Sequence, residues 1–323
     1  MPRVSTIRWN RRSVLASMAV LSVGAGMGRR DAMARASAVT RYTMTAFTNG
    51  SDNDLYVYES EDATTFTLLR ACAYRPPAGL VRDPSLLRHT DGGYYLAYTT
   101  AGDGNTIGFA RSADRLTWTH LGDYPVPVLR AKAAWAPTWF TGLSGYVSVL
   151  VSISTGQGFR PYLIIATDPA RPVWSPPIPL AGIGPQQPGH LGYIDTTVVP
   201  YGGSYYAFTK NESTKYIELA VASGPLGPYR FIGTGDWAGW GAPREGHCVI
   251  PLPDSGHRIY LDAYTEKRYF YSDSYDGFRT WTPPVQLPDL SGTIRHVSVL
   301  PESAGTPLPA GLSNPGPGPA VTA

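Results

Sequence analysis

Five stretches of this chain resemble one another, and three of them carry an acidic residue at a similar position. The stretches cover residues 81–87, 135–140, 194–199, 244–250 and 294–300, so they follow one another at intervals of about 50 to 60 residues. The acidic residues are Asp83, Asp195 and Glu245. If the stretches are equivalent strands of a repeating fold, these carboxyl groups face one another across one pocket. Clustered carboxyl groups raise one another's pKa, so one group can hold a proton while another stays ionised. The pattern therefore indicates general acid–base chemistry.

The segments that would position these residues have the pattern of β-strands. Apolar residues alternate with a period of two, and helical periodicity is almost absent. Each of the first four stretches is followed by a turn signal rich in Gly or Asp and then by a strand. These strands are expected at residues 94–98, 146–151, 205–208 and 258–263. A third strand and an outer strand with an aromatic residue complete each repeat. Each repeat is therefore expected to form one four-stranded blade of a β-propeller.

The two ends of the repeating region complement each other. Residues 42–69 supply three strands without an inner strand, and residues 294–300 supply an inner strand with nothing after it. Pairing them closes the ring and removes the exposed strand edges. The sequence therefore predicts an all-β, five-bladed β-propeller over residues 39–300. Residues 301–323 are rich in Pro, Gly, Ala and Ser without periodicity, which predicts a disordered tail.

The first 38 residues have the pattern of an export signal. Arg11 and Arg12 precede an apolar run from Val14 to Met27, and the segment closes on the small residues 36–38. The arginine pair favours the twin-arginine route, with an ordinary signal peptide or a cytosolic tail as the alternatives. The run is too short and too rich in Gly and Ala for a permanent membrane span. We expect a secreted protein.

Charge and cysteine content narrow the range of partners. The whole chain carries a formal charge of +3, but residues 1–38 hold seven arginines and one aspartate, so the remainder carries −3. This remainder has no basic cluster for nucleic acid or a membrane surface, and we expect a monomer. Cys72 and Cys248 are the only cysteines, so no disulfide framework holds the fold, although one bridge between them stays open. No Cys/His cluster has the spacing of a zinc site.

An ordered set of motifs, one in each stretch, resembles glycoside hydrolase family 43. The motifs are Arg-Asp-Pro at 82–84, Trp-Ala-Pro at 135–137, Ile-Asp at 194–195, Glu-Gly-His at 245–247 and Arg-His at 295–296. None is specific alone, but the ordered set is, and it covers nearly all of the chain after the signal. The family contains five-bladed propellers that act as arabinanases, α-L-arabinofuranosidases and β-xylosidases.

The resemblance implies a role for each acidic residue. Asp83 would be the general base that activates water, Glu245 the general acid, and Asp195 the residue that tunes and orients the acid. This arrangement implies inversion, with the base and the acid about 6.5–9.5 Å apart to admit a water molecule. The expected substrate is a carbohydrate with arabinofuranosyl bonds. A β-xyloside or another furanoside is the alternative; no C-terminal sandwich of the kind many xylosidases use fits after Leu300.

Further residues are expected to bind the substrate. They are Trp135, Trp240, His247, Arg295 and His296. Trp135, Trp139, Trp237 and Trp240 are candidates for stacking on sugar faces, whereas Trp118, Trp174 and Trp281 lie on outer strands and are expected to pack between blades. The resemblance also places His296 beside a calcium ion or a water molecule at the propeller axis. No cofactor is expected to be required.

Other functions fit parts of the pattern. Residues 274–281 match the Asp-box pattern of sialidases, with looser versions at 60–62 and 112–118, but these lie on outer turns, and no arginine cluster or Tyr–Glu pair accompanies them. Family 32 hydrolases share Arg-Asp-Pro but carry a further motif that this chain lacks. The alternative from a different class is a non-catalytic sugar-binding propeller, which would tolerate Asp83→Asn and Glu245→Gln without loss of function.

Overall fold

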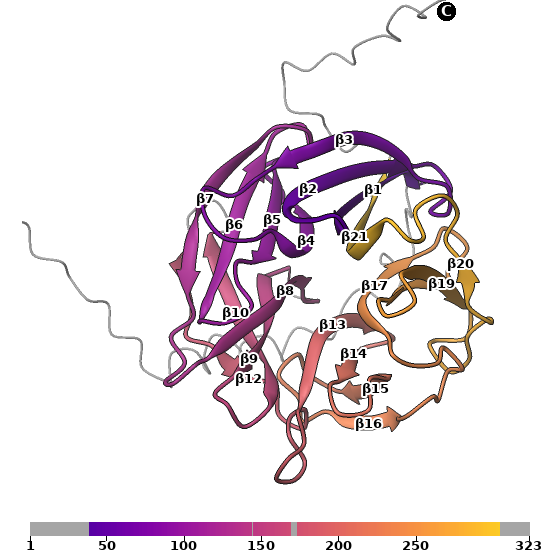
Figure 1. The fold of residues 1–323 in the computed structure, drawn as a ribbon. Coiled ribbons are helices and arrows are strands. Elements are labelled where there is room, and N and C mark those ends of the chain that lie inside the picture. The colour runs from indigo at the N-terminus through magenta and orange to yellow at the C-terminus, as the bar shows by residue number, and fades with distance from the viewer. Residues whose placement is uncertain (1–38, 144, 169–172, 304–323) are drawn as a thin grey trace, which may run out of the picture. The chain divides into compact units, whose positions relative to one another are not determined.

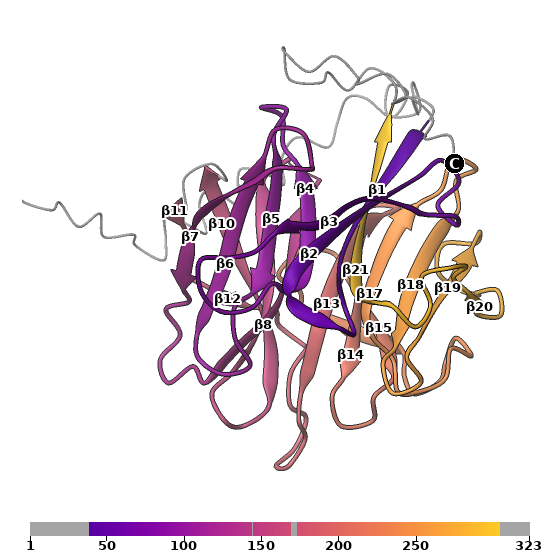
Figure 2. The same cartoon turned by 45° about the horizontal axis from the view of Figure 1, so that its top comes forward.

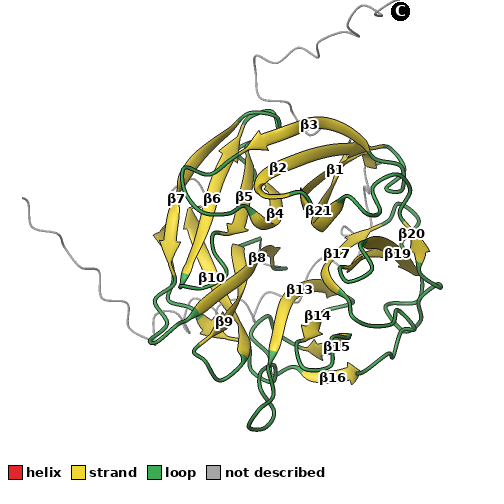
Figure 3. Cartoon of the chain, in the orientation of Figure 1, coloured by secondary structure: helices red, strands yellow, loops and turns green. Residues whose placement is uncertain are grey.

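The computed structural model describes residues 39–143, 145–168 and 173–303, and within these ranges the chain is built from strands and loops without helices (Figures 1 and 3). Five sheets surround a common axis, which confirms the expected five-bladed β-propeller. Among these residues there is no helix with the length and apolar character needed to cross a bilayer. The predicted export signal, residues 1–38, and residues 304–323 of the predicted tail lie outside the described ranges.

Each blade begins with an inner strand beside the axis and ends with an outer strand. One blade contains β4 (Arg82–Arg88), β5 (Tyr94–Thr99), β6 (Thr106–Ser112) and β7 (Trp118–Pro125). The next contains β8 (Ala133–Thr141), β9 (Val147–Ser154), β10 (Phe159–Asp168) and β11 (Val173–Trp174), and β12 (Ile178–Pro179) also pairs with β10. The third contains β13 (Tyr193–Tyr201), β14 (Ser204–Asn211), β15 (Ile217–Ala222) and β16 (Arg230–Gly233).

The last two blades differ in how their outer and inner strands are supplied. One contains β17 (Glu245–Pro251), β18 (His257–Ala263), β19 (Arg268–Ser274) and β20 (Val285–Gln286). Trp281 was expected on its outer strand, but that strand lies further along the chain, and Asp276 holds the turn before Trp281 through the N–H groups of Arg279 and Thr280. The other contains β1 (Val39–Thr48), β2 (Ser51–Ser60) and β3 (Thr67–Tyr74), with β21 (Ile294–Ser303) as its inner strand.

The pairing of β1 with β21 closes the ring, as predicted (Figure 2). The two strands are antiparallel, and Thr43 lies opposite Leu300. Strand β21 runs to Ser303, three residues beyond the predicted end of the propeller. The reason is Glu302, whose buried carboxylate accepts hydrogen bonds from Arg41, Thr43 and Tyr94. These bonds, together with the Arg88 ion pair at 2.9 Å, order the end of the strand.

The hydrophobic core is divided into five clusters, and each cluster joins two neighbouring blades. Trp118, Trp174 and Trp281 belong to these clusters, so their predicted packing role is confirmed. Trp174, for example, stacks on Phe109 of the neighbouring blade with ring centroids 4.6 Å apart. Burial of large rings between sheets adds to the apolar area that holds one blade to the next.

The three Asp-box-like stretches are turn motifs, as expected from their positions. Asp62, Asp114 and Asp276 each accept hydrogen bonds from the backbone N–H groups two to four residues ahead and from the serine two residues before them. Side-chain capping of this kind fixes a tight turn without sheet pairing. These aspartates therefore serve the fold.

Candidate active site

The inner strand of every blade is irregular at the same level, where its pairing with the adjacent strand shifts register. One residue at each irregularity has a positive φ, between 43° and 56°: Asp83, Ala136, Asp195, Gly246 and His296. Positive φ is uncommon outside glycine, and bulges re-aim side chains near active sites. As a result, two consecutive residues of a strand reach the axis. Both Arg82 and Asp83 line the central pocket, as do both Ile194 and Asp195.

The bulges correct one feature of the predicted register. Asp83, Asp195 and Glu245 were expected at the same position of their strands, but Gly246 occupies the position equivalent to the two aspartates. Glu245 lies one residue earlier, opposite Asp262, as Arg82 lies opposite Thr99. The glycine is required here, because a Cβ at Gly246 would come within 3.0 Å of the backbone and side chain of His296.

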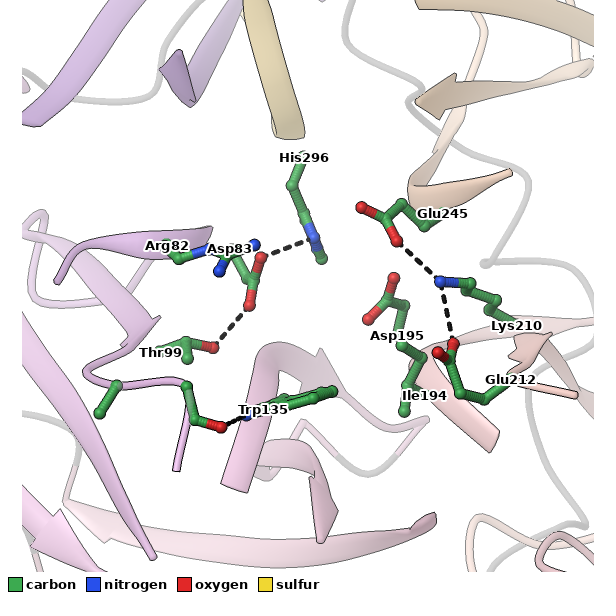
Figure 4. A pocket seen from close by; sticks show the side chains of 12 residues that line it. Arg82, Asp83, Thr99, Trp135, Ile194, Asp195, Lys210, Glu212, Glu245 and His296 are labelled. Atoms are coloured by element: carbon green, nitrogen blue, oxygen red, sulfur yellow. Dashed lines mark hydrogen bonds and ion pairs between the residues drawn. The ribbon is translucent and has the colours of Figure 1, made fainter. Parts of the chain in front are cut away.

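The three predicted carboxyl groups nevertheless meet in one pocket at the propeller axis (Figure 4). Asp83 lies on one side, and Glu245 lies on the other beside Lys210. The pocket is lined by Arg82, Asp83, Thr99, Ala101, Gly102, Trp135, Ile194, Asp195, Lys210, Glu212, Glu245 and His296. Charged groups therefore dominate its surface, and four of them are carboxyl groups.

Asp83 is held as a carboxylate. One oxygen is 3.0 Å from His296 Nδ1, and the other accepts a hydrogen bond from Thr99 Oγ1 at 2.7 Å. Thr99 Oγ1 in turn accepts a hydrogen bond from the backbone N–H of Ala136, which fixes its orientation. Burial alone would raise the pKa of Asp83, but the charge and hydrogen bond of His296, the charge of Arg82 and the Thr99 bond together hold it far below the usual range. Asp83 is thus ionised and available to accept a proton.

Asp195 has the opposite tendency. Its side chain is 5% exposed, and burial raises its pKa to about 6, with the charges of His296 and Lys210 opposing this shift and those of Glu245 and Asp83 adding to it. Its Oδ2 accepts a hydrogen bond from the N–H of Gly246 at 2.9 Å. Two carboxyl groups with pKa values pushed apart in this way can take different roles near neutral pH.

Glu245 is held between two cations. Lys210 Nζ is 2.7 Å from one carboxylate oxygen, and Arg295 Nη2 donates to the other at 2.7 Å. Arg295 is itself fixed by Asp262, which accepts from Arg295 Nε at 2.6 Å and from the N–H of His296 at 3.1 Å. The side chain of Glu245 remains 18% exposed toward the pocket. The predicted acid therefore occupies a fixed position from which a substrate can be reached.

His296 contacts Asp83 and lies in the field of all three acidic residues. Burial lowers its pKa, but Asp83, Asp195 and Glu245 together raise it to about 9, so the imidazolium is charged at neutral pH. Its Nδ1 is occupied by Asp83. Within the described ranges no group of three or more His, Cys, Asp or Glu side chains is arranged to hold a metal. These contacts do not favour the metal role of His296, which stays a prediction.

Trp135 forms an apolar wall of the pocket, in line with its expected position. Its ring rests against Phe159 with centroids 4.5 Å apart, and its indole N–H donates to the carbonyl of Gly102 at 2.9 Å. The orientation of the ring is therefore fixed. With Ile194 on the same pocket, it provides the kind of surface against which a sugar ring packs.

Two other predicted substrate-binding residues do not reach the pocket. His247 is buried, its Nε2 is 3.0 Å from the carbonyl of Phe208, and burial lowers its pKa to about 3, so it is a neutral core residue. It misses the pocket because the bulge at Gly246 breaks the period-two alternation that would place residues 245 and 247 on the same face of the strand. Trp240 is 3% exposed and packs between Trp237 and Trp281. Arg295 reaches the site through Glu245.

The remaining stacking candidates also lie elsewhere. Trp139 packs in the core against Phe109 and Trp174. Trp237 donates its indole N–H to the carbonyl of Ile217 and lines a separate groove formed by residues of two neighbouring blades. Cys72 and Cys248 are both free, so no disulfide forms between them.

Sequence reasoning missed Lys210, Glu212, Thr99 and Arg82 as pocket residues. Arg82 was visible only as part of the Arg-Asp-Pro motif. Lys210 gave the clearest signal, since it follows the apolar residues of a strand. Its two neighbours in that strand are buried. A lysine within such a strand must find an anionic partner, because an unpaired buried charge is costly.

Comparisons with known proteins show what the fold resembles. No protein-family model matches the chain, and no curated protein matches it. Solved structures do. A thermostable family-43 glycoside hydrolase aligns with a TM-score of 0.58 and 18% identity over 86% of this chain and 94% of its own. An endo-arabinase from Bacteroides thetaiotaomicron aligns with a TM-score of 0.54 and 14% identity over 77% of this chain and 89% of its own.

An exo-β-1,3-galactanase from Clostridium thermocellum aligns with a TM-score of 0.52 and 15% identity over 66% of this chain. The chain spans about half, 49%, of that enzyme's length. The sequence identities are low throughout, so these likenesses establish the five-bladed architecture, and the chemistry of the pocket must be argued from its residues.

Proposed function

We propose that this protein is an inverting glycoside hydrolase. The observation that carries the proposal is the convergence of Asp83, Asp195 and Glu245, from three different blades, on one axial pocket with an aromatic wall. The lowered pKa of Asp83 supports its role as the base, because hydrolysis of a glycosidic bond with inversion needs an ionised carboxylate to take a proton from water. The structural neighbours include glycoside hydrolases, which is consistent with this assignment.

The proposed reaction uses Asp83 and Glu245, which lie on two sides of the pocket. Asp83 takes a proton from a water molecule while the oxygen of that water forms a bond to the anomeric carbon. The bond from the anomeric carbon to the leaving oxygen breaks, and Glu245 gives that oxygen its proton. Asp195 accepts a hydrogen bond from the N–H of Gly246, the residue after Glu245, and so helps to orient the acid. Opposite faces of the sugar are used, so the product has the inverted configuration.

We propose an arabinofuranosyl-containing oligosaccharide or polysaccharide as the substrate, acted on outside the cell after export. A β-xyloside or another furanoside is the second candidate, and the galactanase likeness adds β-1,3-galactan to the compounds worth testing. A sugar-binding propeller without catalysis is the alternative from a different class.

The test is hydrolysis of an aryl α-L-arabinofuranoside, an aryl β-xyloside, linear arabinan and β-1,3-galactan by the wild-type protein and Glu245→Gln. We expect arabinoside cleavage that falls by about 10²–10⁴-fold in the variant, the range that a general acid contributes. Cleavage of another compound would keep the mechanism and change the substrate. Sugar binding without turnover, unchanged in Glu245→Gln, would replace the enzyme by the binding propeller.

A further inference from the structure

Lys210, like Phe47, differs from the residues at the equivalent position of the other three blades. In each blade one residue of the second strand lies opposite the residue that precedes the bulge: Phe47, Thr99, Ser152, Lys210 and Asp262. Three of these side chains accept a hydrogen bond from the bulge N–H of the following blade. Thr99 accepts from Ala136, Ser152 from Asp195 and Asp262 from His296.

An ammonium group has no lone pair, so Lys210 is unable to accept such a bond. The corresponding N–H, that of Gly246, donates instead to Asp195 Oδ2 at 2.9 Å. At this position, therefore, a pocket carboxyl group and not a residue of the second strand accepts from the bulge N–H. A residue that departs from a structural pattern inside a candidate active site indicates a role in the chemistry.

The contacts of Lys210 show what that role involves. Its side chain is 2% exposed, and its Nζ lies 2.7 Å from Glu245, 2.9 Å from Glu212 and 5.0 Å from the centre of the Tyr264 ring. Glu212 lies two residues further along the chain and also pairs with Lys215. Lys210 is therefore shared between the candidate acid and a second carboxylate that takes no part in the proposed reaction.

We propose that Lys210 is a positioning residue that holds Glu245 in place and, through its sharing with Glu212, sets the pH at which Glu245 loses its proton. The consequence for catalysis rests on the proposed function, whereas the electrostatic part concerns only the residues of the pocket. A cation in contact with a carboxyl group favours its ionised form. An anion that draws this cation away weakens that effect.

The other charged and titratable groups around Glu245 divide between the two signs. Arg295 contacts its second oxygen, and His296 lies on the same strand as Arg295. Asp195 and Asp262 act in the opposite sense to the cations, since each is an acid whose pKa Glu245 raises. Tyr264 faces the same cluster, and burial raises its pKa. Lys210 and Glu212 are the pair that can be altered without removing a contact of Asp83 or Asp195.

The experiment measures the titration of Glu245 directly, by ¹³C NMR of the full protein labelled at the glutamate side-chain carboxyl carbons. The Glu245 signal is assigned from its absence in Glu245→Gln. We expect the titration midpoint to rise by about 1 pH unit or more in Lys210→Met, because a cation in contact has been removed. We expect it to fall in Glu212→Gln, where Lys210 is no longer shared, and to stay near the wild-type value in Lys210→Arg.

Opposite shifts in the two variants distinguish an electrostatic role from structural damage, which has no reason to change sign. Lys267→Met removes an exposed lysine and is the control, with an unchanged midpoint expected. Midpoints that do not move in Lys210→Met and Glu212→Gln would overturn the inference. If Lys210→Met does not fold, the fall in Glu212→Gln still decides, since Glu212 is partly exposed.

The same variants connect the inference to catalysis. The alkaline limb of the pH profile of kcat/KM is expected to follow the NMR midpoints in direction, as it reports the proton of the general acid. If the protein hydrolyses a glycoside in a Glu245-dependent way but the Glu245 midpoints do not move in the variants, the role of Lys210 is refuted and the proposed function stands. Shifted midpoints in a protein that hydrolyses no glycoside would do the reverse.

Discussion

At the scale of single residues, the surroundings of Asp83 and Asp195 shift their pKa values in opposite directions. Asp83 has a cation and a hydroxyl donor, whereas the side chain of Asp195 has one backbone N–H and is almost completely buried. Desolvation disfavours the charged form, and an adjacent cation favours it, so the two groups move in opposite directions. Chemically identical side chains at equivalent positions of two blades thus acquire different protonation near pH 6.

The raised pKa of Asp195 predicts a pH-dependent effect on stability. Its pKa rises on folding from about 4 to about 6, so the folded state binds its proton more tightly than the unfolded state. Its contribution to stability is therefore present below pH 4 and is lost as the pH rises through 6. We expect Asp195→Asn to raise the free energy of unfolding at pH 8 by about 1–3 kcal/mol relative to wild type, and to change it little at pH 4.

Urea denaturation at the two pH values measures this difference. Asp276→Asn is the matched control of opposite sign, because hydrogen bonds from Thr280 lower the pKa of Asp276 to about 2. That variant is expected to be less stable than wild type above pH 4 and to approach it at pH 2. A stability difference in Asp195→Asn that is the same at pH 4 and pH 8 would show that burial does not control this carboxyl group.

At the scale of strands, the inner edge of each blade is completed by its neighbour. An inner strand has unpaired backbone N–H groups on the side facing the axis, and such groups need partners. Besides the N–H groups at the bulges, three more have a side chain of the preceding blade as their acceptor. Ser298 accepts from the N–H of Leu86, Ser85 from that of Trp139 and Cys248 from that of Val299. These bonds run around the axis and hold the register of one blade against the next.

Cys248 is therefore expected to behave as a hydrogen-bond acceptor and not only as a small apolar residue. Burial raises the pKa of its thiol to about 11, so the neutral thiol accepts from Val299 at 3.3 Å. Cys248→Ala leaves that N–H unpaired and should reduce the free energy of unfolding by about 1–3 kcal/mol. Cys248→Ser keeps an acceptor and should cost less than the alanine change.

Thermal or urea unfolding of the two variants gives the comparison. Cys72 is exposed, so Cys72→Ala and Cys72→Ser are controls that should leave stability unchanged. Equal losses in Cys248→Ala and Cys248→Ser would assign the role of Cys248 to packing alone.

The strands and their order could be predicted from the sequence because their signals are local. Period-two alternation and Gly- or Asp-rich turns identify the hairpins, and the intervals between the stretches fix the number of blades. The bulges could not be predicted, since Asp83 and Asp195 at these positions contact residues of other blades, His296 and Ser152. For this reason the positions of Asp83, Asp195 and Glu245 were predicted at the pocket, while His247 was placed there wrongly.

At the scale of the whole propeller, fold closure and the candidate site depend on the same strand. Strand β21 supplies the missing inner strand to β1, and it also carries Arg295 and His296, which contact Glu245 and Asp83. The buried carboxylate of Glu302 near its end is held by Arg41 and Arg88. Pairing of the first and last strands should therefore be a condition for an ordered pocket.

This dependence predicts complementation between two fragments. A chain that ends at Thr293 should lack a cooperative thermal transition, because one blade has an open edge and both the pocket residue His296 and Arg295, the partner of Glu245, are missing. Addition of a peptide of residues 294–303 should restore the transition and any hydrolytic activity. The same peptide with Glu302→Gln should bind about 100-fold more weakly, since breaking a buried ion pair costs about 3 kcal/mol or more. Calorimetric titration measures both affinities. Cooperative unfolding and activity in the chain without the peptide would show that the pocket forms independently of closure.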